Sequence, residues 1–455
     1  MSAQEIWSSK LIFLFAAVGA AVGLANIWKF PYTAGQHGGG GFMLVYLFAV
    51  LFISLPVIAT EFFLGRRGKA GPVSSIVNVA KEARLSPLWG AAAYAGTLAA
   101  LLVMGFYFVI TGWIIYYAVQ MLSGTLTGLS PAQVGQFFDD LTQNETLSVA
   151  WHSLAAFLTW IIVAAGLKNG IERFVRYLMP LLLILLVIVN IYAAIYGDLQ
   201  AALIFLFQVR VEDISAKTVL YASGQAFFTV GAGSCVMIVY GSYLPRSVSI
   251  MRSSFQIVAA DTVVAMLAGM AIFPLVFAFD LQPTEGPGLL FVTLPIVFGQ
   301  SAAGSIIGCA FFLMVAIAAI TSAIAIVQPP IIWLQRHFGM PRLAASALAI
   351  FIMWLLGLGT VCSFASCSGF YPLGFIPLFA EMNFFKVMEM TAINICLPVG
   401  ALLLAIFVGW RLPYAICADE LQEQNIYLMK FWYFCMRYII PPAILMIMFF
   451  GLAGS

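Results

Sequence analysis

The chain has 455 residues, of which 63% are hydrophobic and only 8% are charged. Soluble domains carry about 25% charged residues, so this composition excludes most soluble folds and indicates one polytopic membrane bundle. A formal net charge of +2 argues against nucleic acid as a partner. The seven cysteines show no metal-binding spacing, and the polar start of the chain does not predict a cleavable signal peptide.

Runs without charged residues predict the membrane spans, because a crossing helix needs about 20 mostly apolar residues. We therefore expect an all-α membrane protein, a single domain over residues 1–455, with eleven transmembrane helices. The expected helices are 11–36, 41–65, 88–122, 150–167, 170–196, 218–243, 254–279, 302–335, 343–361, 384–410 and 430–452.

Two of these helices carry glycines near the middle of the span. In the first, Gly19 and Gly23 have a GxxxG spacing that fits either close helix packing or an unwound turn. The sixth helix also contains two glycines near its middle, Gly231 and Gly233. Irregular backbone is tolerated in lipid only where it is buried in protein or lines a cavity. Matching breaks in helices 1 and 6 predict a 5+5 inverted repeat with a substrate site between the repeats. The repeats are expected at 11–196 and 218–410, with helix 11 at 430–452.

Basic residues predict the orientation of the bundle. With the N-terminus inside, all Lys and Arg residues except Lys29, Arg210, Lys217 and Lys386 fall in cytoplasmic segments. This positive-inside bias predicts a multi-pass protein of the inner (plasma) membrane. Its N-terminus is expected to be cytoplasmic and, after an odd number of crossings, its C-terminus extracytoplasmic.

Two features of the outer side are open to interpretation. Residues 280–300 are rich in Pro and Gly and are expected to form a re-entrant cap. Cys362 and Cys367 fall near the outer end of the ninth helix, where an oxidising compartment would let them pair. We expect them to be solitary thiols.

Five motifs, in order along almost the whole chain, resemble those of the neurotransmitter:sodium symporter family. The resemblance implies the fold of that family's bacterial leucine transporter, an eleven-helix bacterial subgroup, and symport of an amino acid with Na⁺ by alternating access. The motifs are Gly23–Tyr32, Gly38–Phe42, Asn169–Phe174 with Met179-Pro180, Gly224–Thr229 and Thr321–Pro329.

The resemblance also implies two sodium sites, made of the oxygen ligands that hard cations prefer. The first would use the carbonyls of Gly19, Val22 and Ala318 with the hydroxyls of Thr321 and Ser322. The second would use the carbonyl of Ala21 with the side chains of Asn26, Thr229 and Asp261.

Each assignment has an alternative. Thr321 and Ser322 could bond back to their own helix. An ionised Asp at a helix centre costs about 2.5–3.5 kcal/mol, so Asp261 needs a partner, either sodium or another polar group, unless it lies at the membrane edge.

Many members of the family need chloride, and Tyr46, Gln225 and Thr229 match three of its ligands. No Glu occupies the seventh-helix position at Val264 or Ala265 that replaces the anion in some members. Because Asp261 could supply the fixed negative charge instead, we expect that chloride is not required.

The substrate pocket implied by the resemblance contains two aromatic residues with assigned roles. Tyr107 would hydrogen-bond the substrate carboxylate and Phe228 would act as a lid, although ordinary aromatic packing would also explain both. Ser234 and Ala323 are small, which favours a large hydrophobic or aromatic substrate. The full set is Ala20, Ala21, Leu24, Ala25, Val103, Tyr107, Phe228, Thr229, Gly231, Ser234, Ser322, Ala323 and Ile326.

Gate residues are implied at both ends of the pocket. Lys29 and Glu389 would form the outer pair, while Trp7, Tyr243 and Gln328 match inner-gate positions. The usual inner ion pair cannot form, because Gln4 and Arg336 occupy its two positions. Lys10 and Arg336 are therefore the residues to inspect at the inner gate.

Two further residues have open interpretations. In the fifth helix, Gly170 and Pro180 could mark local unwinding that lets water reach the first sodium site, or a static kink. Glu61 either braces the unwound segments or sits at the membrane interface.

The function expected is sodium-coupled import of a neutral, hydrophobic or aromatic L-amino acid. The alternatives are a transport-inactive sensor or scaffold and a symporter of GABA or taurine. An enzyme is not expected, because HExxH, P-loop and GxSxG motifs are absent. The expected partners are the small-molecule substrate, sodium ions and the lipid bilayer; the oligomeric state is left open.

Overall fold

The computed structural model describes residues 6–280, 288–421 and 425–453. These residues form helices and connecting segments, with no strand among them. Within this part of the chain, nine helices are long and apolar enough to cross a membrane, and the first helix adds a tenth as a pair bent by 54°. The prediction of an all-α membrane protein is confirmed. The predicted total of eleven spans is reached only if the two short halves of the sixth helix are counted together as one more span. This total stays a prediction.

Of the first five spans, the first, second and fifth each contain one π-helical turn, and the third and fourth contain none. The bounds of the five spans agree with the predicted ones within a few residues, except that the fourth begins five residues early, at Glu145. In chain order the helices are α1 (Lys10–Ala21), η1 (Ala25–Lys29), α2 (Phe30–Gln36), α3 (Gly40–Ala49), η2 (Val50–Ser54), α4 (Leu55–Gly68), α5 (Pro72–Glu82), η3 (Pro87–Gly90), α6 (Ala91–Leu122), α7 (Pro131–Gln143), α8 (Glu145–Ala164), η4 (Leu167–Glu172), α9 (Arg173–Tyr196) and α10 (Leu199–Phe207).

In the second half of the chain, the spans Phe384–Arg411 and Ile426–Leu452 also contain π-helical turns. Part of the expected cap at 280–300 is helical, and residues 281–287 lie outside the described residues. The helices are η5 (Val211–Asp213), α11 (Ala216–Thr229), α12 (Val236–Ser242), α13 (Ile250–Ala278), η6 (Leu289–Thr293), α14 (Leu294–Phe298), α15 (Ala302–Ile326), α16 (Gln328–Phe338), α17 (Arg342–Phe364), η7 (Pro377–Phe379), α18 (Phe384–Met390), η8 (Thr391–Cys396), α19 (Leu397–Ile406), η9 (Phe407–Arg411), α20 (Tyr414–Leu421), α21 (Ile426–Phe434), η10 (Cys435–Ile439) and α22 (Ile440–Ala453).

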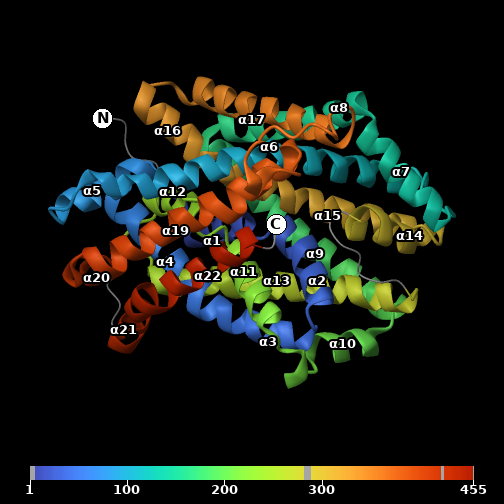
Figure 1. Cartoon of the computed structure of the whole chain (residues 1–455), viewed down its shortest axis with the longest axis horizontal. Coiled ribbons are helices and arrows are strands. Elements are labelled where there is room, and N and C mark those ends of the chain that lie inside the picture. Colours follow the sequence, from blue (N-terminus) through green and yellow to red (C-terminus); the bar gives the residue numbers. More distant parts are fainter. Residues whose placement is uncertain (1–5, 281–287, 422–424, 454–455) are drawn as a thin grey trace.

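Helix α1 lies in the middle of the bundle, where it packs against α15, α13 and α9 (Figure 1). Helix α6 runs beside α15, α8 and α17. Small residues permit this close approach: a Cβ on Gly112 of α6 would lie 2.6 Å from the backbone nitrogen of His152 on α8. The spans that contain α6, α13 and α15 are accordingly among the most buried of the bundle, with 67–78% of their apolar stretch buried.

The first helix is broken where the sequence predicts it. Helix α1 ends at Ala21, Val22 is extended with φ −70° and ψ 106°, and helical structure resumes at Ala25. Gly23 is required by its neighbour, because a Cβ there would lie 2.6 Å from the hydroxyl oxygen of Ser322. An unwound turn, rather than packing alone, explains the GxxxG spacing.

The sixth helix is broken between α11 and α12. Gly231 and Gly233 have φ values of +61° and +83°, and Cys235 also lies in the left-handed region at +65°. Glycine adopts such backbone without steric cost. A Cβ on Gly233 would in addition lie 2.4 Å from the carbonyl oxygen of Leu397. Both breaks place backbone carbonyl and amide groups inside the bundle, close to one another.

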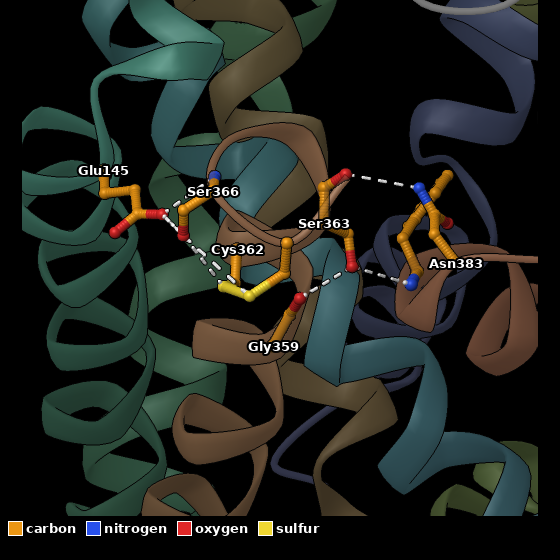
Figure 2. The surroundings of a disulfide bond; sticks show 8 residues. Glu145, Gly359, Cys362, Ser363, Ser366 and Asn383 are labelled. Atoms are coloured by element: carbon orange, nitrogen blue, oxygen red, sulfur yellow. Dashed lines mark hydrogen bonds between the residues drawn. A yellow bond between two sulfur atoms is a disulfide. The ribbon is translucent and has the colours of Figure 1, made fainter. Parts of the chain in front are cut away.

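The prediction of solitary thiols at Cys362 and Cys367 is wrong: the two form a disulfide at the end of α17 (Figure 2). Helix α17 ends at Phe364, and the turn that follows brings Cys367 back beside Cys362, with a hydrogen bond of 2.8 Å from the Cys367 amide to the Cys362 carbonyl. The spacing alone did not predict this turn.

Candidate functional site

A cavity of about 440 Å³ lies between four spans: the two broken helices, helix α6 and helix α15. Every residue predicted for substrate binding lines it except Ala323, which is fully buried behind the wall. Further wall residues were missed by the sequence reasoning. Those on α6 lie on the same helical face as Val103 and Tyr107, a signal that could have found them. The missed residues include Ala100, Phe106 and Ile110 on α6, Val236 and Met237 on α12, and Phe385, Ile393 and Leu397.

One polar spot stands out in this apolar cavity. The Tyr107 hydroxyl is buried and makes no hydrogen bond of normal geometry. It lies beside Gly23, where a Cβ would be 3.1 Å from the hydroxyl oxygen and 2.6 Å from that of Ser322. A buried polar atom without a partner is costly, so this spot suits a polar ligand group.

The oxygens expected to form the first sodium site lie together. Ser322 on α15 donates through its hydroxyl to the carbonyls of Gly19, at 3.2 Å, and Val22, at 3.0 Å. The Thr321 hydroxyl donates to the carbonyls of Ile317 and Ala318, each at 3.0 Å, which is the back-bonding left open as an alternative. Carbonyl oxygens at the end of α1 thus lie opposite hydroxyl oxygens on one turn of α15. Oxygen atoms are the ligands that small hard cations prefer.

The side chains expected in the second site are in direct contact. Asp261 is fully buried, and its carboxylate accepts from the Asn26 amide nitrogen at 2.8 Å and from the Thr229 hydroxyl at 3.0 Å. Of the partners left open by the sequence, these contacts are to polar groups of the protein. The Asn26 side-chain oxygen points elsewhere and accepts from the Gly23 amide at 3.1 Å. To offer this oxygen to a cation beside Asp261, the amide group would have to turn over.

Residues expected around a chloride ion adjoin this carboxylate. Gln225 donates through its side chain to the Ala25 carbonyl at 2.9 Å. Tyr46 is fully buried, and its hydroxyl makes no hydrogen bond of normal geometry. Thr229, the third of these residues, donates to the Asp261 carboxyl group, which therefore adjoins this set.

The outer gate pair expected from the sequence does not form in this structure. The ammonium of Lys29 lies 4.3 Å from the centre of the Phe228 ring. Glu389 instead accepts from Lys386 at 2.9 Å. Lys386 precedes Glu389 by three residues on α18, so it reaches the carboxylate without any movement of another helix. All three charged groups line the cavity at its α18 end.

Trp7, which the resemblance places at the inner gate, is only 5% exposed. Its indole nitrogen donates to the Tyr240 carbonyl at 3.1 Å, and its backbone amide donates to the Tyr243 carbonyl at 3.3 Å. The next amide, of Ser8, donates to the carboxylate of Glu172 at 3.0 Å. This contact fixes the segment before α1 to the start of the fifth span.

The residues to inspect at the inner gate are Lys10 and Arg336, and Lys10 is the first residue of α1. Arg336 lines a separate small cavity beside α5, and Gln4 lies outside the described residues. Gln328 accepts instead from Arg342 at 3.0 Å, and Arg342 also donates to the Val163 carbonyl at 2.9 Å. Glu172 and Arg342 were missed because their partners are a backbone amide and a neutral side chain.

Glu61 braces the break in the sixth helix, which settles the choice left open by the sequence. Its carboxylate is 1% exposed and accepts from the amides of Gly233, at 2.8 Å, and Met237, at 3.2 Å. These amides are at the start of α12, where the partial positive charge of a helix end favours an anion.

Comparisons with known proteins agree with this arrangement. A model of the sodium:neurotransmitter symporter family matches residues 4–133 and 133–454. An uncharacterised sodium-dependent transporter of Bacillus subtilis, YhdH, is 35% identical over 451 residues, which cover 98% of this chain and 97% of the relative. An uncharacterised sodium-dependent transporter of Haemophilus influenzae is 30% identical, with the same two shares.

A solved structure has the same fold. The crystal structure of MhsT in complex with L-phenylalanine matches with a TM-score of 0.88 and 36% sequence identity, over 99% of this chain and 100% of MhsT. The family model and the relatives describe transporters rather than enzymes. The chain therefore belongs to the sodium:neurotransmitter symporter family and is a sodium-dependent, multi-pass membrane transporter.

Proposed function

We propose that this transporter imports a neutral, hydrophobic or aromatic L-amino acid together with sodium by alternating access. The observation that carries the proposal is the polar spot at Tyr107, beside Gly23 and Ser322. The rest of the cavity is lined mainly by apolar groups, apart from the charged side chains at its α18 end. Such a cavity accepts a molecule with one charged end and one apolar end. MhsT, whose structure contains L-phenylalanine, has the same fold.

In this proposal the substrate carboxylate lies against the first break. The Tyr107 hydroxyl donates to it, and its negative charge adds to the oxygens that attract a cation. The apolar side chain then extends towards Ile326, Val236 and Leu397. A cavity of about 440 Å³ has room for an aromatic ring.

Sodium would be the coupled ion at both oxygen clusters. At the first, Ser322 and Thr321 would turn their hydroxyl hydrogens away and offer oxygen to the ion, with the carbonyls of Gly19, Val22 and Ala318. At the second, Asp261 supplies a full negative charge beside Thr229, Asn26 and the end of α1 at Ala21. We infer that this charge does the work of chloride, so that transport proceeds without it.

Alternating access requires that the two ends of the cavity close in turn. Trp7, at the expected inner gate, is held by buried contacts, whereas Lys29 and Glu389 are not yet paired at the outer gate. Closure there would bring Lys29 to Glu389 over Phe228. We also propose that the π-helical turn η4, which contains Gly170, and Pro180 within α9 let the fifth span unwind and release sodium at the first site.

The deciding experiment uses the purified full chain in liposomes with an inward sodium gradient. We expect sodium-dependent accumulation of L-phenylalanine or another large apolar amino acid among the twenty, with taurine and GABA as further candidates. Replacing Ser322 with Ala should weaken apparent sodium affinity about tenfold, as expected for the loss of one polar contact.

The matched control for this substitution is Ser346→Ala, which removes a buried hydroxyl on α17 that bonds only to its own helix at Leu343. No accumulation of any candidate, with sodium-dependent binding retained, would replace this proposal with the sensor or scaffold function.

A further inference from the structure

A closed ring at the end of α17 contacts the helix that borders the cavity entrance. The disulfide between Cys362 and Cys367 closes a six-residue segment, called here the disulfide ring, residues 362–367. Within it, the Ser363 hydroxyl accepts from the Phe385 amide at 3.1 Å. The Ser363 carbonyl accepts from the Asn383 side chain at 3.2 Å (Figure 2). Both partners lie at the start of α18.

These bonds meet a specific need of α18. The first four amides of a helix have no partner within the helix. Here the Asn383 side chain caps the amide of Lys386 at 3.0 Å, and the disulfide ring supplies the acceptor for Phe385. The same two residues border the cavity, together with Glu389 one turn further along α18. The position of the entrance charges thus depends on an acceptor outside their own helix.

The other side of the disulfide ring is attached to α8. The carboxylate of Glu145, the first residue of α8, accepts from the Ser366 amide at 3.1 Å and also from its hydroxyl (Figure 2). The ring of Phe364 packs against that of Phe385, with centroids 5.2 Å apart. Three helices are therefore joined at one small covalent ring, which limits the conformations open to the residues that it encloses.

We propose that the disulfide ring 362–367 is the positioning element of the cavity entrance: it holds Ser363 in place, and thereby the first turn of α18 with Lys386 and Glu389. Reduction by dithiothreitol would break the S–S bond, give two cysteine thiols and convert the reagent to its cyclic disulfide. Ser363 is then free to leave Phe385, and the first turn of α18 loosens. The effect on transport, but not the effect on the helix, rests on the function proposed above.

Hydrogen exchange of the full-length protein in detergent tests the effect on the helix. We expect reduction to speed amide exchange over residues 383–390 about tenfold, the factor that corresponds to one lost hydrogen bond. Ser363→Ala should have the same effect with the disulfide intact. In the double variant C362S/C367S exchange should already be fast, and dithiothreitol should change nothing further.

The controls separate this effect from general loosening. Exchange in α5, Pro72–Glu82, should not change, and Cys309→Ser, which removes a half-buried free thiol, should respond to reduction as the parent does. Unchanged exchange over 383–390 after alkylation has proved both thiols free would overturn the proposal.

The second readout is sodium-driven uptake of L-phenylalanine. A loosened entrance should raise KM several-fold in the reduced protein and leave the maximal rate nearly unchanged, whereas general unfolding would lower the maximal rate. An unchanged KM with fast exchange would show that the ring positions α18 without serving transport, and would overturn that part of the proposal. If the parent protein accumulates no amino acid, the proposed function fails while the exchange result still stands.

Discussion

Two buried carboxylates show how single residues divide the work around the breaks. Glu61 receives its hydrogen bonds from backbone amides of the sixth span, so it fixes the path of the chain there. Asp261 receives its hydrogen bonds from the side chains of Asn26 and Thr229, which can rotate. A side chain that can rotate can exchange its partner for an ion, and a braced backbone cannot. This difference supports a structural role for Glu61 and the ion-binding role that we propose for Asp261.

Replacing Asp261 with Asn tests its charge without changing its shape. The amide keeps hydrogen-bonding capacity but has no negative charge, so apparent sodium affinity in chloride-free buffer should fall about 10- to 100-fold, as for the loss of a charged hydrogen bond. Chloride should restore part of it. The measurement is sodium-dependent uptake or binding in chloride and in gluconate.

Asp198→Asn is the matched control, because Asp198 caps α10 outside the cavity and Asn caps helices equally well. If D261N binds sodium as the parent does in both buffers, the carboxylate does not act as the fixed charge.

At this scale the sequence predicted which residues meet but not how each atom is used. Asn26, Thr229 and Asp261 come together as expected, because family motifs fix helix registers. The Asn26 side-chain oxygen accepts from the Gly23 amide while its nitrogen donates to Asp261. Residue spacing does not predict which way round the amide group lies. Likewise, Lys386 pairs with Glu389 because the two residues lie three positions apart on one helix, whereas Lys29 lies on another helix.

Among the helices, a buried ion pair joins α4 to α20. Arg66 and Glu420 are 2% and 1% exposed and lie 2.5 Å apart, and Arg66 also donates to the Val248 carbonyl at 2.6 Å. Arg246 approaches the same carboxylate at 3.4 Å. Breaking a buried pair leaves an uncompensated charge, which costs far more than the pair itself contributes.

We therefore expect Glu420→Ala to lower the free energy of unfolding by about 3–5 kcal/mol. Glu82→Ala removes an acid that is 45% exposed and paired with Arg67, so it should cost no more than about 1 kcal/mol. Thermal unfolding in one detergent compares the two variants. Equal losses would show that Glu420 is not held in a buried pair.

Acid should weaken the outer part of this cluster. Hydrogen bonding from Arg67 lowers the pKa of Glu82 and of Asp419. A carboxyl whose folded pKa is lowered adds stability above its ordinary pKa of about 4 and loses it as the pH falls through the lowered value. The melting temperature of the parent should thus fall more between pH 6 and pH 3 than that of Arg67→Gln, by the small amount typical of exposed ion pairs. Parallel pH profiles for the two proteins would contradict this.

For the molecule as a whole, the apolar runs and the glycine clusters sufficed to predict the helices and both breaks. Low charge and the presence of paired glycines within an apolar run are local properties that a sequence records directly. The disulfide, the Glu172 contact and the wall residue Leu397 depend on turns and on distant chain segments. Those were missed because nothing in their own neighbourhood marks them.

The orientation of the bundle can be tested directly. A bias of basic residues towards one side predicts that the N-terminus stays in the cytoplasm and that the C-terminus emerges outside. Fusing alkaline phosphatase, which is active only outside the cytoplasm, after Ser455 should give an active enzyme in a bacterial host. Fusion after Glu82 should not. Activity of both, or of neither, would contradict the odd number of crossings.

The length of the cavity has a pharmacological consequence. One continuous space reaches from Ser322 to Lys386 and Glu389, so the region that recognises the charged end of a ligand and the entrance share the same walls. A compound with an amino acid head and a long rigid tail could seat its head by Tyr107 while the tail props the passage ajar. Such a compound would occupy the carrier without being carried, and lengthening a substrate would turn it into an inhibitor.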